Sequence, residues 1–474
     1  MVISYEFIIL NMKISHKSYS GETGYNMFYN HSVTVINDKG KHISVYSLAL
    51  PLFFESIFLL LYGTVNTLML SGYSPEAVSA TSVAQQIIGI FTVILNMITK
   101  GSVILISINL GSKNIKKAAD ITGSGCFLTV IISLMFTAFC VLFSKQLIGM
   151  MNLSGKAYTM ACEYLKFYAC FFPCAATMSY FNNLLICNGF SKFSMTGGIV
   201  SNIVNIILSY IVLYTDVDLP FSVVKAVAVS AGLAQTAGMF LAVIFFIKKH
   251  CPFKLKIAKS LVIQILKFGI PSGMCLLFFY IAQAITTSFI TVLGVTVINT
   301  KVYVSNIVGY TSKVSLALGN ATSVFVGRYR GAEKFDKIKI LYRQNLLIAI
   351  MFNITLSVLA FVFRRQLLSM FTDNKTIIKT ALPILIIDIF VEIGRGVNHI
   401  TENSLNANGD VKTTFITSVA TCWACSVLLA YIFSVRLGLG LTGIWIAFAA
   451  DEISKGIIYL LRWKSGKWEK IKIQ

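Results

Sequence analysis

Long apolar segments separated by short polar turns dominate the sequence. Stretches such as QQIIGIFTVILNMI (85–98) and FLTVIISLMFTAFCVLF (127–143) approach the roughly 20 residues that cross a bilayer as a helix. Beginning near His42, such segments follow one another at about 43–70, 77–107, 119–144, 157–187, 193–215, 221–247, 259–292, 297–326, 338–363, 376–406, 412–435 and 439–463. The pattern predicts an all-α membrane protein with twelve transmembrane helices.

Composition supports a membrane protein. Of the 474 residues, 56% are hydrophobic and 12% are charged, about half the charged share usual for a soluble domain. A soluble fold of this length needs far more polar surface, so we expect the apolar excess to face the lipid bilayer.

In a soluble protein a formal charge of +21 would suggest a nucleic-acid partner, so the location of the basic residues decides how this charge is interpreted. With the N-terminus placed inside, 21 Lys and Arg residues fall in inner segments. The opposite connections hold six, namely Lys145, Lys156, Arg364, Arg365, Lys375 and Arg436. This asymmetry follows the positive-inside rule and predicts a plasma (inner) membrane protein with both termini cytoplasmic and no nucleic-acid partner.

The first 42 residues differ from the rest of the chain. They open with a short apolar run and lack a small-residue cleavage site, so residues 1–42 are expected to form a disordered cytoplasmic tail and not a signal peptide. Met27 is an alternative start, which leaves open whether residues 1–26 belong to the native protein. The remaining chain is expected to divide into an N-lobe over 43–257 and a C-lobe over 258–474.

The sequence repeats itself once. Landmarks recur at an offset of 220 residues: Pro51 with Pro271, Gly111 with Gly331, FSKQLIGM from Phe143 with FRRQLLSM from Phe363, and Asn188 with Asn408. Each repeat holds six spans, an even number, so both halves enter the membrane with the same orientation. Two bundles that rock around a midplane cavity suit a transporter, although a duplication that only adds stability is the alternative.

Pro51 and Pro271 each lie early in the first helix of their half. A proline inside a helix removes an amide hydrogen bond, so both are candidate kinks that free a carbonyl toward the cavity. The alternative is that each proline occupies the first helical turn and starts the span.

Several segments resemble the multidrug and toxic compound extrusion (MATE) family. They include ALPLFFESIFLLLYGTVNTLMLS, GSVILISINLGSKN, FGIPSG, EIGRGVNHITENSLNANGDVKTT and GLTGIWIAFAADEISKG, followed by RWKSGKW, and together they extend over about 43–468. The resemblance implies two six-helix lobes in a V-shaped bundle. It also implies efflux of small amphiphilic molecules, driven by H⁺ or Na⁺ and without another cofactor.

Two positions depart from the family pattern. Many MATE proteins have a proton-coupling aspartate where this chain has Asn66, which cannot titrate. Others have a glutamate of a C-lobe cation site where this chain has Cys275. Neither ionic role transfers to this chain, so other acids would have to serve.

The tenth span carries the densest set of polar residues. Its members are spaced by steps of three or four and, at about 100° per residue, form one stripe: Asp388, Glu392, Arg395, His399, Glu402 and Asn406. Such a stripe must face protein or a water-filled cavity, and burial raises the pKa of a carboxyl group, so its acids suit reversible proton or Na⁺ binding. Glu392 and Arg395 also have the spacing of an ion pair, and the stripe could be a neutral structural element.

Acids in two other spans complete the candidates. In the last span Asp451 is expected to pair with Lys455, which leaves Glu452 as the freer acid or as a contact to the tenth span. In the first span Glu55 is expected either to bind the ion or substrate, or to accept a hydrogen bond from a nearby amide such as Gln85 or Gln86.

The residues therefore sort into two groups. The ion-coupling or substrate candidates are Glu55, Asp388, Glu392, Arg395, Glu402 and Glu452, and the secondary polar candidates are Asn66, Gln85, Gln86, His399 and Asp451. Cys422 and Cys425 form a CxxC inside an apolar span without a second pair or nearby histidines, so no metal site is expected.

The sequence thus predicts a secondary antiporter that exports amphiphilic or cationic compounds by alternating access. No catalytic nucleophile with a plausible base is present in the pattern, so no enzyme is expected, and we expect a monomer. A lipid-linked precursor flippase of the same superfamily is the closest alternative. A membrane receptor or scaffold that binds without transport is the other.

Overall fold

A computed structural model describes residues 35–36, 42–151, 155–215, 222–291, 295–370 and 374–471. The predictions for residues 1–42, including the start at Met27, lie almost wholly outside these ranges. Within them, β1 (Val35–Ile36) pairs antiparallel with β2 (His42–Ile43), with Val35 opposite Ile43.

Seven helices follow in the first half of the chain, which we call the N-lobe. They are α2 (Val45–Tyr73), α3 (Pro75–Gly111), α4 (Ile115–Gly149), α5 (Gly155–Cys170), α6 (Phe172–Cys187), α7 (Ser191–Tyr214) and α8 (Val223–Lys248). Helices α5 and α6 meet at a 55° bend and together occupy the length of one span. The predicted segment 157–187 is therefore a broken span.

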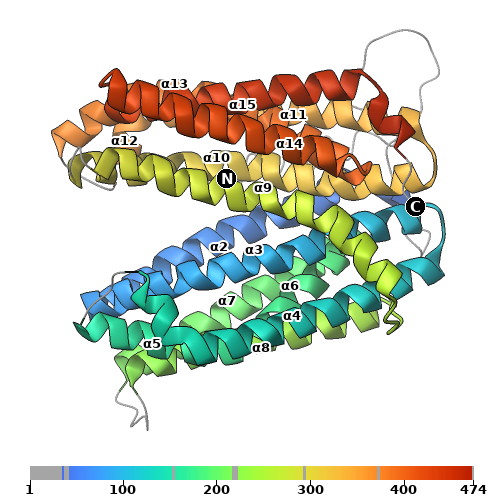
Figure 1. Ribbon diagram of the computed structural model, residues 1–474, viewed down its shortest axis with the longest axis horizontal. Coiled ribbons are helices and arrows are strands. Elements are labelled where there is room, and N and C mark those ends of the chain that lie inside the picture. Colours follow the sequence, from blue (N-terminus) through green and yellow to red (C-terminus); the bar gives the residue numbers. More distant parts are fainter. Residues whose placement is uncertain are drawn as a thin grey trace, which may run out of the picture. The chain divides into compact units, whose positions relative to one another are not determined.

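The second half, the C-lobe, repeats this order. Its elements are α9 (Lys259–Thr291), α10 (Val295–Gly331), α11 (Phe335–Val362), α12 (Arg364–Ser369), α13 (Lys375–Ala407), α14 (Val411–Thr421), the π-helical η2 (Cys422–Leu429) and η3 (Ile432–Arg436), α15 (Gly440–Lys464) and the 3₁₀ turn η4 (Lys467–Lys470). In Figure 1 the helices of each half lie together as a group.

The helices differ in how well they match a lipid-exposed span. Among the described residues, eight helices are long and apolar enough to cross a membrane, and the bent α5–α6 pair is a ninth candidate. Helices α10, α13 and α15 do not meet the combined limits on hydropathy and charged residues, and α13 packs against both α10 and α15. These helices are more polar because they face one another, as the polar stripe on α13 requires.

The helix ends define two sides of the bundle. We call the side that holds the turns after α3, α6, α10 and α13 the linker end, and the opposite side the far end. The lobes are packed together at the linker end, where a Cβ atom on Gly111 would overlap the carbonyl of Arg328, and one on Gly331 would overlap the carbonyl of Ile108. Both pairs of contacts obey the 220-residue offset, so α3 and α10 meet in a pseudo-symmetric way.

A buried arginine adds a hydrogen bond to this contact between the lobes. The Nη2 atom of Arg328, on α10, donates to the carbonyl of Cys187 at the end of α6, at 2.9 Å, and the residue is 6% exposed. By contrast, Arg330 on the same helix remains within the C-lobe, where its Nη1 atom donates to the carbonyl of Glu469 at 2.9 Å.

The connection between the lobes, residues 249–258, is fixed to α4. The amide of Lys254 donates to the carbonyl of Ala119 at 3.1 Å, and Ser124 donates to the carbonyl of Lys256. Lys256 also forms an ion pair with Asp120 at 3.2 Å. This connection is therefore bound to the N-lobe along most of its length.

The two prolines lie inside their helices. Pro51 is six residues beyond the first residue of α2 and Pro271 twelve beyond that of α9, so neither occupies the first turn and that alternative is wrong. Pro51 leaves the carbonyl of Ser47 without its usual helical donor, and the hydroxyl of Ser191 on α7 donates to it at 3.3 Å. This carbonyl is thus used within the N-lobe and does not point to a cavity.

Candidate functional site

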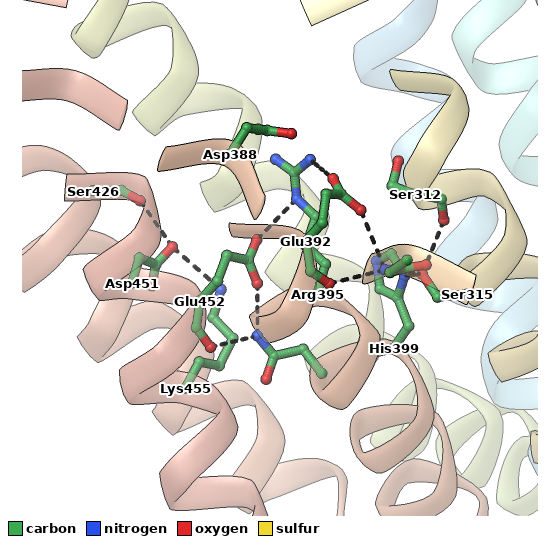
Figure 2. Close-up of polar contacts among 12 residues, drawn as sticks. Ser312, Ser315, Asp388, Glu392, Arg395, His399, Ser426, Asp451, Glu452 and Lys455 are labelled. Atoms are coloured by element: carbon green, nitrogen blue, oxygen red, sulfur yellow. Dashed lines mark hydrogen bonds and ion pairs between the residues drawn. The ribbon is translucent and has the colours of Figure 1, made fainter. Parts of the chain in front are cut away.

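The polar stripe of α13 is buried in the C-lobe, where α10, α11 and α15 pack around it (Figure 2). Glu392 is fully buried. Its Oε1 atom accepts from Nη1 of Arg395 at 2.7 Å, and its Oε2 atom accepts from Nδ2 of Asn353 on α11 at 3.2 Å. The predicted Glu392–Arg395 ion pair is therefore present, and one neutral amide supports it.

Arg395 also contacts an acid on a second helix. Its Nε atom lies 3.4 Å from Oε1 of Glu452 on α15, whose Oε2 atom accepts from Nδ2 of Asn398 at 2.6 Å. Glu452 is thus not the freer acid of the last span, and the alternative contact to the tenth span is the one the structure has. One guanidinium is shared by two carboxylates in the same buried space.

The close approach of α13 and α15 makes this sharing possible. A Cβ atom on Gly394 would lie 2.7 Å from the Cβ atom of Glu452, closer than side-chain carbons come. Glycine at this position lets the two helix backbones approach, and the arginine one residue further along α13 then reaches the neighbouring helix.

Asp388 lies one turn before Glu392 on α13 and is 3% exposed. Its Oδ1 atom accepts from the indole Nε1 of Trp445 on α15 at 3.1 Å. Asp388 is in no ion pair within the described part of the chain, although it is near enough to Arg395 for electrostatic attraction. It therefore adds a third negative group to the surroundings of the shared guanidinium.

Asp451 and Lys455 form the predicted pair on α15. The Nζ atom of Lys455 lies 3.3 Å from Oδ2 of Asp451, and the hydroxyl of Ser426 on η2 donates to the same oxygen at 2.8 Å. The pair is neutral in itself, and Lys455 is also near enough to Glu452 for electrostatic attraction, so it adjoins the group around Arg395.

The rest of the α13 stripe contacts different helices. His399 Nδ1 lies 2.9 Å from the hydroxyl of Ser315 on α10, and Asn406 accepts from Thr414 on α14 at 2.6 Å. Glu402 lies between these two residues on the helix and is partly buried. The stripe therefore faces protein along its length but does not form one compact site.

Glu55 on α2 occupies a separate position in the N-lobe. Its Oε2 atom accepts from the hydroxyl of Ser194 on α7 at 3.4 Å. The proposed amide partner is wrong, because Gln85 donates instead to the hydroxyl of Tyr164 at 3.2 Å. Gln86 is exposed and Asn66 partly buried, and neither joins Glu55 in a cluster.

Asparagines on two helices were missed by sequence reasoning but belong to the C-lobe network. Asn353 on α11 donates to both the carbonyl and the carboxylate of Glu392, and Asn398 on α13 donates to Glu452. A lone amide inside an apolar span was the available signal, and Asn353 in IMFNITL carries it clearly.

The two cysteines of the CxxC are free thiols, and Cys422 donates to the carbonyl of Phe278 at 3.8 Å. Within the described ranges, no group of three or more His, Cys, Asp or Glu residues is arranged to hold a metal ion. The candidate site is thus a set of carboxylates, amides and one shared guanidinium.

Comparison with known proteins identifies the family. The sequence profile of the family named MatE matches residues 51–211 and 271–432, one match in each repeat. "Uncharacterized transporter YisQ" of Bacillus subtilis (strain 168) is 32% identical over 434 residues, which cover 90% of this chain and 95% of that protein. "Probable multidrug resistance protein NorM" of Thermotoga maritima is 26% identical over 434 residues, covering 89% and 92% of the two chains.

Solved structures share the fold. One described as "Crystal structure of MATE in complex with MaD3S" aligns with a TM-score of 0.83 at 21% identity, over 90% of this chain and 96% of that one. Another, described as an outward-facing conformation of a multidrug resistance MATE family transporter, aligns with a TM-score of 0.82 at 20% identity and the same coverage. These likenesses confirm the predicted all-α fold of two six-helix repeats. The chain belongs to the MatE family, whose members are transporters and not enzymes, and it is a multi-pass integral membrane protein.

Proposed function

We propose that the protein is a secondary antiporter that exports amphiphilic organic cations in exchange for H⁺ or Na⁺. Family membership supports efflux, and the Thermotoga maritima relative carries the description of a probable multidrug resistance protein. The distribution of Lys and Arg residues supports an orientation with the linker end and both termini in the cytoplasm, and we propose the plasma membrane as the location. Each chain holds both lobes, so a monomer suffices for transport.

The observation that carries the proposal is the sharing of Arg395 by Glu392 and Glu452. Two carboxylates and one guanidinium leave an excess negative charge, and Asp388 adds to it nearby. An unbalanced charge is costly in a membrane interior, so a proton or a cation is expected to neutralise it. The group thus has the composition of a site that is occupied in turn by a coupling ion and by a cationic substrate.

Arg395 suits the role of a switch between these states. When Glu392 binds a proton, it loses its charge and its attraction for the guanidinium, which can then pair more closely with Glu452. Because Glu452 lies on α15 and Glu392 on α13, this exchange changes the contact between two helices of the C-lobe. Binding of the ion therefore acts on helix packing, as coupling requires.

The test is transport by the purified full chain in liposomes. Efflux of a fluorescent organic cation is followed under an imposed pH gradient or Na⁺ gradient, for the parent, for Glu392→Gln and for Glu163→Gln. The control acid pairs with Lys225 at 3.1 Å at the far end, outside the network. We expect gradient-driven flux to fall roughly 5- to 150-fold in Glu392→Gln, the factor that corresponds to typical coupling free energies between two sites. Flux is expected to persist in the control variant.

The gradient that drives flux identifies the coupling ion. Flux that Glu392→Gln leaves unchanged would exclude Glu392 as the coupling acid and point to Glu55 or to the last span. An absence of flux under both gradients would contradict antiport, and transfer of a lipid-linked phosphate between leaflets in the same liposomes would then support the flippase alternative.

A further inference from the structure

A cavity lies in the C-lobe at the far end, away from the acidic network. It has a volume of about 670 Å³ and is lined by seven residues: Arg365, Gln366, Ser369, Lys375, Ile378, Lys379 and Leu382. The first three belong to α12 and the other four to the start of α13 (Figure 1). We propose that this cavity binds the phosphate headgroup of an anionic phospholipid.

Both helices present their lining residues on one face. On α13 the residues are spaced i, i+3, i+4 and i+7, which places them on a single stripe. Helix α12 is held in place from behind, because Leu368 is fully buried in the C-lobe core and Leu367 packs against it. The cavity therefore has walls on two anchored helices.

The cavity is strongly basic. Among the described residues that line it, Arg365, Lys375 and Lys379 are charged and none is an acid. None of these cations takes part in an ion pair with another described residue. An anion with several oxygen atoms can accept charge-assisted hydrogen bonds from all of them.

The positions of Lys375 and Lys379 are electrostatically unfavourable without a bound anion. Lys375 and Lys379 are one turn apart, where like charges repel, and they lie at the N-terminal end of α13, where the helix dipole disfavours cations. Under the proposed orientation they also lie on the side that the positive-inside rule depletes of basic residues. A phosphate group would relieve the first two costs together.

The internal repeat shows what distinguishes this cavity from its counterpart. By the 220-residue offset, Lys375, Ile378 and Lys379 correspond to Gly155, Tyr158 and Thr159. In the N-lobe the hydroxyl of Tyr158 donates to the carbonyl of Lys145, the mate of Arg365, at 3.1 Å. The C-lobe has isoleucine where the N-lobe has this bridging tyrosine, and it has lysine where the N-lobe has Gly155 and Thr159. The space between α12 and α13 therefore lacks the tyrosine bridge and has cations at two positions that are uncharged in the N-lobe.

The surroundings favour a lipid over a free phosphate ion. Ile378 and Leu382 give the cavity an apolar side, and two apolar residues that flank α12 are exposed, Phe363 at 50% and Met370 at 79%. The cavity lies at the ends of spans, where headgroups meet acyl chains. An amphiphile with a phosphate and hydrocarbon tails matches both kinds of lining residue.

The experiment measures lipid binding to the purified full chain in a neutral detergent. Phosphatidylglycerol, phosphatidylcholine or inorganic phosphate is added, and bound lipid is counted by native mass spectrometry alongside the melting temperature. The site variant combines Arg365→Gln, Lys375→Gln and Lys379→Gln. The control combines Lys145→Gln, Lys156→Gln and Arg436→Gln, which removes the same charge from other parts of the far end.

We expect phosphatidylglycerol to bind the parent and the control alike and the site variant about 100-fold more weakly, as three surface cations contribute to anionic-lipid binding. The charge-preserving variant combines Arg365→Lys, Lys375→Arg and Lys379→Arg, and it is expected to retain binding. It shows whether the loss in the site variant results from the missing charge or from misfolding. Ile378→Tyr, which recreates the N-lobe side chain, is expected to weaken binding without a change in charge.

Three results would overturn the proposal. One is an equal loss of phosphatidylglycerol binding in the site variant and in the control variant, which would indicate general electrostatic attraction to the protein surface. Another is equal binding of phosphatidylcholine and phosphatidylglycerol. The third is a melting-temperature increase from inorganic phosphate as large as that from phosphatidylglycerol, which would make the ligand a phosphate ion.

Discussion

At the scale of single residues, the charges in the C-lobe differ in what balances them. Lys455 and Asp451 balance each other, with side chains only 9% and 4% exposed. Arg395 cannot balance both Glu392 and Glu452. The first arrangement is expected to stabilise the fold, and the second is available for ion binding.

This distinction predicts that the protein loses stability when Asp451 loses its cationic partner Lys455. Lys455→Met leaves a buried carboxylate without its cation, and we expect the free energy of unfolding to fall by about 3–5 kcal/mol. The double variant Asp451→Asn, Lys455→Met removes both charges and is expected to be more stable than the single variant. Unfolding followed by tryptophan fluorescence measures both; equal losses would contradict a charge-pairing role.

Residue contacts within one helix were predictable, and contacts between helices were not. The pairs Glu392–Arg395 and Asp451–Lys455 follow from helical spacing alone. The contact of Glu452 with Asn398, and that of Glu55 with Ser194, depend on how two helices are rotated about their axes. Hydrophobic periodicity gives that rotation only coarsely, so the sequence left open whether Glu452 was free or contacted the tenth span, and the suggested contact of Gln85 with Glu55 was wrong.

At the scale of helices, glycines determine where the lobes can touch. A Cβ atom on Gly101 of α3 would overlap the backbone of α9 at Ile265 and lie 2.9 Å from the amide nitrogen of Gly269. Gly89, on the same helix, has no atom within 4 Å of the corresponding position. The two glycines therefore differ in packing although both lie inside α3.

Gly101→Val is expected to force α3 and α9 apart, whereas Gly89→Val is expected to change packing little. Because the overlap at Gly101 is with backbone, which cannot rotate away, we expect a loss of about 1–3 kcal/mol in stability, as in other overpacked sites. Thermal unfolding of the two variants in the same detergent measures the difference. A similar melting temperature for both would show that this contact between the lobes is not tight.

The helix limits were predicted closely, but local irregularities were not. The expected span 259–292 corresponds to α9 at Lys259–Thr291, whereas the expected span 412–435 contains α14 followed by two π-helical segments. A run of apolar residues shows where a span lies because burial in lipid sets its length. The hydrogen-bond register inside the span depends on neighbours such as Asp451, which contacts Ser426 on η2.

At the scale of the whole protein, the repeat was the most informative feature of the sequence. The 220-residue offset recurs in the structure, in the paired contacts Gly111–Arg328 and Gly331–Ile108.

The sequence did not predict at which end of the bundle the two lobes are in contact. In the structure the lobes are in contact at the linker end, and Arg328 adds a hydrogen bond across that contact.

Arg328→Met is expected to shift the population toward a state that is open at the linker end. A hydrogen bond from a charged group contributes about 1.5–3 kcal/mol, so a shift of roughly tenfold or more is expected. Spin labels at Lys116 and Asp336, exposed positions on α4 and α11 related by the repeat, report the distance between the lobes. Arg330→Met is the matched control because Arg330 bonds within its own lobe, and an equal distance change in both variants would exclude a specific role for Arg328.

The attachment of residues 249–258 to α4 limits how the lobes can move. Since Lys254 and Lys256 are bound to the N-lobe, only the few residues before Lys259 remain to absorb any rotation between the halves. A pivot this short allows the two lobes to tilt relative to each other but does not allow them to separate widely. It also keeps each lobe at a high effective concentration relative to the other, so that the contact at the linker end can re-form quickly after every opening.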